Sequence, residues 1–337
     1  MASRTWEPRT RRGNPVLAVG TGYSLWEPPG ERDFDPIRTG MEGGAGHVPG
    51  HMTTYGLKLS QHPDALDDTI ATARLADQLG ADLVSVSEHP FLPDEMDGMT
   101  VLTTLAAHTD RVRLSTNVAT LPLRPPAMFA RQAAALQQVS AGRLVLGLGA
   151  GEPLPRIAGL GGPDLTTRQS VDALAEGIEV LRALWRGDAP VHHDGTHYRL
   201  VDATVGPAPN PSIPIWVGAF GPRMLGITGR LADGWLPTNY FLELADVPTM
   251  QRRIDDAATS AGRDPDTITR AFNVFGLISD TVPTRNDRQL HGPVDFWVDA
   301  LRDYVRRLRF DTIVYWPNRD QQAQTELFLR EVVPRVG

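Results

Sequence analysis

Two side chains that can transfer protons each follow a largely apolar run of residues. Glu152 comes after the run Arg143–Leu148 and three small residues, and His89 comes shortly after the run Asp82–Ser87. Histidine titrates near neutral pH, and a carboxylic acid at a partly apolar site has its pKa raised by desolvation. Either side chain could therefore act as a general acid or base. The alternatives are a solvated glutamate in a tight turn and a histidine that bonds only to backbone.

The glycines before Glu152 allow the backbone to approach a ligand closely. Gly147 and Gly149 fit the first two positions of the dinucleotide-binding fingerprint, but Glu152 stands where its third glycine belongs. We therefore interpret the glycine turn that ends at Gly151 as the C-terminal end of a barrel strand, where α/β barrels carry their chemistry.

A second glycine turn, from Gly218 to Gly221, separates a short apolar run from a predicted helix that begins at Pro222. Backbone N–H groups at the positive end of a helix form an anion site. Barrels often bind phosphate late in the chain, so this turn predicts the position of a phosphate group. The alternative is an ordinary turn between a strand and a helix.

A polar insertion contains three histidines, which are His192, His193 and His197. Such a cluster raises the question of a metal site. A hairpin turn is predicted at Asp194 and Gly195, and we interpret the histidines as part of a solvated hairpin. A metal-dependent barrel hydrolase is expected to carry two histidines at the end of its first strand, where this chain has only His62. We therefore predict no metal site.

Composition is that of a globular protein with a sizeable core. The chain has 337 residues, a hydrophobic fraction of 41% and a net charge of -7. The acidic balance argues against nucleic acid or an anionic membrane as a partner, and a small-molecule substrate is expected. The absence of cysteine excludes disulfides, thiolate catalysis and cysteine-ligated metals. No apolar stretch reaches the ~18 residues of a membrane span, and the N-terminus lacks the apolar region of a secretory signal, so we predict a cytoplasmic protein.

The elements that position these side chains alternate along the chain from Thr54 onward. Apolar runs predict strands at Tyr55–Ser60, Asp82–Ser87, Val112–Val118, Arg143–Leu148, Pro214–Val217, Gly234–Leu236, Thr269–Ile278 and Thr312–Trp316. Amphipathic runs predict helices from the cap residue Asp64 to Leu79 and at Met99–His108, Pro126–Val139, Thr167–Trp185, Pro222–Leu231, Val247–Ala261, Val294–Leu308 and Gln322–Val333.

Eight such units predict an α/β fold, a (β/α)8 TIM barrel with insertions, as a single domain over residues 52–337. The alternative is an open, doubly wound sheet. Residues 1–51 show no periodicity and few apolar side chains, so they predict a flexible N-terminal extension.

Several motifs in this order resemble the luciferase-like flavin and deazaflavin oxidoreductases. They are Leu83–His89, Leu114–Val118, Gly147–Glu152, Trp216–Leu225 with Gly229–Trp235, and the tail Phe310–Pro317. The resemblance covers residues 54–335. It implies a barrel that holds a flavin or deazaflavin and an oxidoreductase activity. It also implies a homodimer, because the family commonly dimerises.

The resemblance also implies roles for individual residues. His89 is expected to face the cofactor ring, with Glu88 beside it in a positioning role, and Glu152 is the expected general acid or base. Asn117 and Val118 are expected to form a non-prolyl cis peptide behind the ring. The expected cofactor-binding residues are Glu88, His89, Thr116, Asn117, Val118, Ala150, Gly151, Gly218, Ala219, Phe220 and Gly221.

The resemblance favours the branch of the family that uses the deazaflavin coenzyme F420. FMN-dependent members often place an arginine in the glycine turn, where this chain has Ala150, although the Glu88-His89 pair is also found among them. We therefore expect hydride transfer between F420 and a small organic substrate. The alternative is an FMN-dependent monooxygenase that uses oxygen and reduced flavin from a partner reductase. A metal-dependent barrel hydrolase and a barrel that binds a cofactor without catalysis are less favoured.

Two departures from the family pattern argue against a sugar-phosphate substrate. Sugar-phosphate dehydrogenases of the family carry an aromatic residue just beyond the histidine, where this chain has Pro93. They carry an asparagine after the glutamate, where this chain has Pro155.

Overall fold

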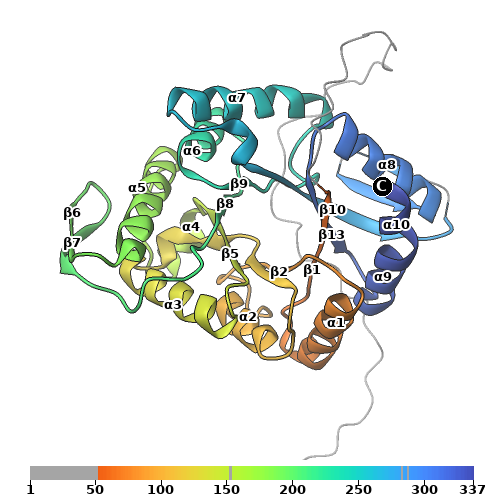
Figure 1. The fold of residues 1–337 in the computed structure, drawn as a ribbon, viewed down its shortest axis with the longest axis horizontal. Helices are drawn as coiled ribbons and strands as arrows, with labels where there is room; N and C mark the ends of the chain where they lie inside the picture. The colour runs from red at the N-terminus through yellow and green to blue at the C-terminus, as the bar shows by residue number, and fades with distance from the viewer. Residues whose placement is uncertain (1–51, 152–153, 282–283, 287) are drawn as a thin grey trace, which may run out of the picture. The chain divides into compact units, whose positions relative to one another are not determined.

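Eight parallel strands pair side by side into a closed ring among the residues that the structure describes, with helices around the outside (Figure 1). The structure is a computed structural model that describes residues 52–151, 154–281, 284–286 and 288–337. The predicted extension at residues 1–51 and the candidate acid–base residue Glu152 lie outside the described residues. The predicted (β/α)8 barrel is confirmed.

The strands of the ring are short and almost fully buried. In order they are β1 (Thr54–Lys58), β2 (Leu83–Val86), β3 (Arg113–Thr116), β5 (Leu144–Gly149), β8 (Ile215–Val217), β9 (Gly234–Trp235), β10 (Thr269–Ile278) and β13 (Thr312–Pro317), and β13 pairs with β1. Parallel strands covered on both faces read as continuous apolar runs, which is why the sequence predicts their positions closely. The prediction for β10 matches the observed bounds at both ends.

Helices follow the strands and pack their apolar stripes on the outer face of the ring. They are α1 (Leu66–Gln78), α2 (Gly98–Ala106), α3 (Pro126–Val139), α5 (Thr167–Arg186), α6 (Pro222–Leu231), α7 (Val247–Ser260), α8 (Val294–Arg306) and α9 (Gln321–Leu327). The bounds predicted for α3 and α6 are confirmed at both ends. A capping box between Thr166 and Gln169 starts α5, and Gly187 ends it in the left-handed region at φ 66.

The interior of the ring changes character along its axis. The part further from the carboxyl ends of the strands is filled by an apolar cluster of Leu83, Val145, Trp216, Leu236, Ala271 and Val314. Strand side chains alternate between the two faces, so the inward positions two residues further along β2 and β10 are Ser85 and Asn273. The interior therefore becomes polar toward the carboxyl ends of the strands, the end at which α/β barrels place their sites.

Two predicted helix boundaries were wrong. Asp64 does not cap α1, because Pro63 starts a 3-10 turn over Pro63–Ala65 and α1 begins only at Leu66. Proline favours the first position of a turn, so the chain turns before it reaches Asp64. The predicted last helix is divided into α9, a π-helical turn at Phe328–Val332 and α10 (Val333–Val336). Pro334 has no N–H to continue the α-helical hydrogen bonds, which accounts for the change.

The insertions contain further short elements. The predicted hairpin is confirmed as β6 (Val191–Asp194) and β7 (Arg199–Ala203), and it lies outside α5 (Figure 1). The structure adds β4 (Ala119–Thr120) beside β5, α4 (Leu154–Gly159), and β11 (Thr284–Asn286) with β12 (Gln289–Gly292) beside β10. No helix in the described part of the chain is both long and apolar enough to cross a membrane.

Candidate active site

His89 lies shortly after the end of β2 and is oriented by a carboxylate. Its Nδ1 lies 3.3 Å from Oε2 of Glu95, and its ring is tilted against Phe91 at 5.6 Å between centroids. Gln61 Nε2 donates to the same Glu95 oxygen at 2.9 Å. The side chain of His89 is 29% exposed. A carboxylate on Nδ1 fixes the imidazole, which leaves Nε2 as the nitrogen that can exchange a proton with a ligand.

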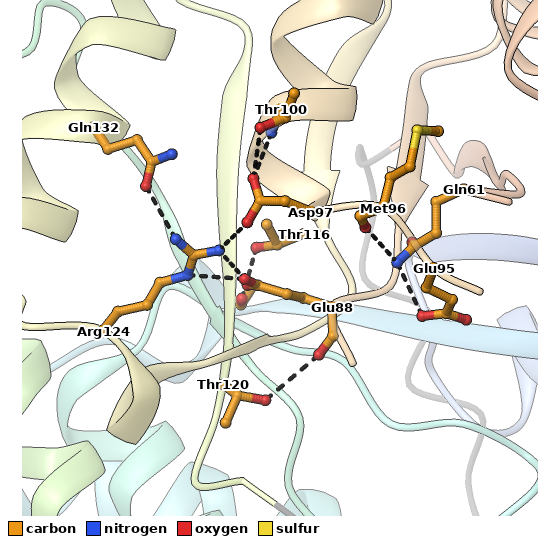
Figure 2. A network of polar contacts seen from close by, with 11 residues as sticks. Gln61, Glu88, Glu95, Met96, Asp97, Thr100, Thr116, Thr120, Arg124 and Gln132 are labelled. Atoms are coloured by element: carbon orange, nitrogen blue, oxygen red, sulfur yellow. Dashed lines mark hydrogen bonds and ion pairs between the residues drawn. The ribbon is translucent and has the colours of Figure 1, made fainter. Parts of the chain in front are cut away.

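Glu88 is buried and forms an ion pair with Arg124, which lies in the segment between β3 and α3. Its Oε1 accepts from Nε of Arg124 at 2.8 Å and also contacts Nη2, while Arg124 reaches Asp97 at 2.6 Å and Gln132 at 3.2 Å (Figure 2). Burial raises the pKa of Glu88, and the bonds from Arg124 offset only part of that shift. Asp97 also caps α2 through Thr100 N at 2.8 Å. The network therefore fixes the backbone that carries His89, which fits the positioning role expected for Glu88.

The peptide bond between Asn117 and Val118 is cis, as the resemblance implies. Three glycines make room for the Val118 side chain. A Cβ added to each would lie 3.3 Å from Val118 at Gly147, 2.9 Å at Gly149 and 3.4 Å at Gly218. Val118 therefore fills the space that these glycines leave open. Val118, Gly147, Gly149 and Gly218 lie in or just after β3, β5 and β8, and we call the surface that they form the wall.

The neighbouring polar side chains face one another across the barrel interior. Asn117 Nδ2 donates to Oδ1 of Asn273 at 2.6 Å, Asn273 Nδ2 returns a bond to Asn117 at 3.1 Å, and Asn117 also reaches Ser85 at 3.2 Å. Thr116 Oγ1 donates to the Gly147 carbonyl at 2.7 Å. The side chains of Thr116 and Asn117 thus hold the wall in place, and Val118 forms part of the wall itself.

The turn at which we expect a phosphate links β8 to α6, and one of its N–H groups departs from the expectation. Gly218 N–H donates to the Leu148 carbonyl at 3.0 Å, so this N–H is committed to the sheet and is not free for a phosphate. The N–H groups of Ala219, Phe220 and Gly221 have no protein acceptor within the described ranges. Gly221 is the N-cap of α6 and provides no side-chain cap. Unpaired N–H groups at a helix N-terminus favour an anion, so these three groups stay the expected phosphate site.

The turn after β5 is partly described. Gly151 has φ 89, in the left-handed region that favours glycine, and Ala150 is partly buried against the core. Glu152 follows directly but lies outside the described residues. Its expected place beside His89 therefore stays a prediction.

The histidine insertion is held by one carboxylate. Glu176 Oε1 lies 3.1 Å from His193 Nε2 and accepts from Tyr198 N at 2.8 Å. It also accepts from His197 N at 3.1 Å. Glu176 thus anchors the hairpin on α5. Among the described residues no group of three or more His, Cys, Asp or Glu side chains could hold a metal ion.

Several residues at the barrel mouth were not predicted from the sequence. They are Lys58, Glu95, Arg124, Asn273 and Trp316. Lys58 is 7% exposed at the end of β1, with its Nζ 4.5 Å from the centre of the Trp316 ring. The one sequence signal was available at Lys58, which is the only lysine of the chain. The others depend on contacts between residues far apart in the sequence.

Comparisons with known proteins agree with this architecture. The family model described as luciferase-like monooxygenase matches residues 44–330. An F420-dependent glucose-6-phosphate dehydrogenase from Mycobacterium avium (strain 104) is 33% identical over 330 residues, which is 83% of this chain and 97% of the relative.

Two solved structures share the fold. An F420-dependent secondary alcohol dehydrogenase in complex with an F420-acetone adduct has a TM-score of 0.76 and 18% identity, covering 85% of this chain and 99% of the other. The monooxygenase RslO1 from Streptomyces bottropensis has a TM-score of 0.71 and 21% identity, covering 84% of this chain and 100% of the other. At this level of identity the similarity shows only that the fold is shared. One of the two structures is named as a dehydrogenase and the other as a monooxygenase.

Proposed function

Because the chain belongs to the luciferase-like monooxygenase family, we propose that it is an oxidoreductase that transfers hydride between coenzyme F420 and a small organic substrate. The observation that carries this proposal is the 33% identity, across 97% of its length, to a relative named as F420-dependent. Ala150 supports it, because this position offers no cation where FMN-dependent members often place one.

The described residues fit such a cofactor. Val118 and the glycines around it would form a flat backing surface for a ring, since no side chain projects from Gly147, Gly149 or Gly218. The N–H groups of Ala219, Phe220 and Gly221, which have no acceptor in the described part of the chain, would hold its phosphate. When bound, the deazaflavin supplies a hydride donor or acceptor, and the protein supplies orientation and proton transfer.

His89 is the described side chain placed to move a proton. Glu95 holds Nδ1 at 3.3 Å, so Nε2 would donate or accept the proton of a substrate oxygen. Glu88 acts through the Arg124 network by fixing the backbone next to His89. Glu152 remains our candidate for the second acid or base. A separate reductase system would recycle the cofactor.

A crystal structure of the complex with F420 tests this arrangement. The ring should lie against Val118, with its phosphate at the N–H groups of residues 219–221 and one edge within hydrogen-bonding reach of His89. A cofactor bound at the amino end of the strands, or outside the barrel, would contradict the assignment.

We propose further that the substrate is not a sugar phosphate, although the relative is named as a glucose-6-phosphate dehydrogenase. Pro93 and Pro155 replace the aromatic residue and the asparagine of the sugar-phosphate enzymes. Glucose 6-phosphate should therefore not reduce F420 in the presence of this enzyme. Reduction at a rate typical of enzymes would contradict the proposal while leaving the cofactor assignment intact.

The second candidate is an FMN-dependent monooxygenase, because the description of the matching family model names a monooxygenase, although the relative named above is F420-dependent. It differs in requiring oxygen and a supply of reduced flavin.

A further inference from the structure

Lys58 is a buried cation at the mouth of the barrel. It is the last residue of β1, and every other basic side chain among the 33 Lys and Arg residues is arginine. Lys58 is 7% exposed, and its Nζ lies 4.5 Å over the Trp316 ring of the adjacent strand β13. The face of an aromatic ring attracts an ammonium group but offers no oxygen or nitrogen acceptor to its N–H groups.

The ammonium group of Lys58 has no hydrogen-bond acceptor or ion-pair partner in the described part of the chain. Gln321 Nε2 donates to the backbone carbonyl of Lys58 at 3.3 Å and does not contact the ammonium group. A buried cation without an acceptor is unfavourable. Desolvation accordingly lowers the pKa of Lys58 to about 8, although the charge of Glu95 opposes the shift.

Other buried polar atoms at the ends of the neighbouring strands have no hydrogen-bond partner among the described residues. They are Gln61 Oε1 after β1, Ser87 Oγ and Glu88 Oε2 after β2, and Asn318 Oδ1 after β13. These strands are consecutive in the ring, in the order β13, β1, β2. Buried polar groups in folded proteins are almost always paired, so a group of such atoms calls for an explanation. A polar ligand at this side of the mouth explains them together.

Aromatic rings extend from Lys58 toward the predicted phosphate turn. Trp316 packs on Phe275 at 5.6 Å and Phe275 on Tyr240 at 6.0 Å. Tyr240 packs on Phe241 at 5.0 Å, and Phe241 on Phe220 at 5.8 Å. The mouth therefore has a row of aromatic rings in contact with one another, with the ammonium group of Lys58 at one end. This combination suits a flat, apolar ligand that carries one electron-rich oxygen.

We propose that Lys58 binds a carbonyl or oxyanion oxygen of a ligand at the barrel mouth and so determines which ligands fit the site. Two sources of that oxygen share this chemistry, namely the substrate and the cofactor ring. Assigning it to either source depends on the function proposed above. The binding of a small anion at Lys58 does not depend on it.

The presence of one lysine allows a direct measurement. Protein labelled with isotope on lysine gives one side-chain signal in an NMR spectrum, and a pH titration of that signal reports the pKa of Lys58. The titration is made on the free protein, with F420, with benzoate as a flat anionic probe, and with both together. An oxygen that reaches Nζ stabilises the charged form and raises the pKa.

A rise in the pKa with F420 alone would place the oxygen on the cofactor ring. A rise that requires benzoate would place it on the substrate. If neither ligand changes the signal or the pKa, while a fluorescence titration shows that F420 binds, the proposal is overturned. If F420 fails to bind, the proposed function fails, and the response to benzoate alone still decides the role of Lys58.

Two variants provide the control. Lys58→Met keeps the shape of the side chain but removes its charge, and it should weaken the binding of the responsible ligand by about tenfold or more. Arg113→Met removes a half-buried cation that lies 5.8 Å over the Trp216 ring, at the first residue of β3 and so at the opposite end of the barrel, and it should leave ligand binding unchanged. Equal losses in both variants would contradict the proposal, because they would indicate a general effect on the fold.

Discussion

At the scale of single residues, the site contains both ion-paired side chains and buried polar atoms that have no hydrogen-bond partner among the described residues. Glu88 is 3% exposed and depends on Arg124 for its charge. Removing one partner of a buried ion pair leaves an uncompensated charge, at a cost of roughly 3–5 kcal/mol. Arg124→Met should therefore lower the free energy of unfolding by an amount near the lower end of this range, because Arg124 is partly exposed.

Urea unfolding of this variant measures the effect, and Glu88→Gln in the same chain should restore part of it. Arg307→Met is the matched control, since Arg307 forms an exposed pair with Asp303 at 2.7 Å and should change stability by less than about 0.5 kcal/mol. Equal effects of the two arginine substitutions would contradict the importance of burial.

Lys58 predicts a pH dependence of stability with a definite sign. Its pKa is lowered from 10.5 to about 8 in the folded protein, so the unfolded chain binds the proton more tightly. Below both values the buried charge costs up to about 3 kcal/mol, and this cost disappears as the pH rises through the interval between them. Lys58→Met should be more stable than the parent protein at about pH 7, and the difference should shrink by about pH 10. A difference that stays constant across this range, in urea unfolding of both proteins, would refute the buried charge.

Individual side chains were predicted where they lie next to a strand end, and missed where a distant residue decides their role. Asn117 and Val118 directly follow β3, and His89 comes shortly after β2, so the sequence predicts their place at the mouth. The roles of Glu95 and Asn273 follow only from the folded structure, because Glu95 bonds Gln61 and Asn273 bonds Asn117, which are distant in the sequence. The position of Glu152 remains a prediction.

At the scale of elements, β3, β5 and β8 form the wall that would support the cofactor ring. A side chain at Gly149 would press on Val118, which lies 2.9 Å from the added Cβ. Gly149→Ala should therefore lower the affinity for F420 by about tenfold or more, because the ring would meet a displaced surface. Adding Val118→Ala should recover part of the affinity by relieving the contact.

A fluorescence titration with F420 measures these affinities. Gly159→Ala is the control, because nothing lies within 4 Å of its added Cβ, and it should bind F420 as the parent protein does. An unchanged affinity of Gly149→Ala would refute the proposed wall.

Regular elements were predicted well because their signals are local. Buried strands are continuous apolar runs, and α3 and α6 each begin at a proline that the sequence displays. The errors arose where local signals compete, as at Pro63 beside Asp64. Short strands in the insertions, such as β12, form because they pair with β10, and no local periodicity marks them.

At the scale of the whole molecule, the barrel closes through β1 and β13, which pair from Thr54 to Leu57. The first strand therefore begins just after Met52. A chain that starts at Met52 should keep the melting temperature and the F420 affinity of the full protein, because all strands of the ring are retained. A drop of more than a few degrees, or a loss of cofactor binding, would mean that residues 1–51 contribute to the fold or the site.

The barrel itself was predictable because alternating strand and helix signals leave few other ways to bury every apolar face. The choice of cofactor is less tightly determined, since the same fold occurs in F420-dependent dehydrogenases and in monooxygenases. That choice decides the class of reaction.

The most direct test of the central claim is an equilibrium titration of one preparation with F420 and with FMN. The account predicts saturable binding of F420, with an affinity at least about tenfold higher than that for FMN. It further predicts that Gly149→Ala reduces the binding of F420. Tight binding of FMN together with no measurable binding of F420 would contradict the claim and support the monooxygenase.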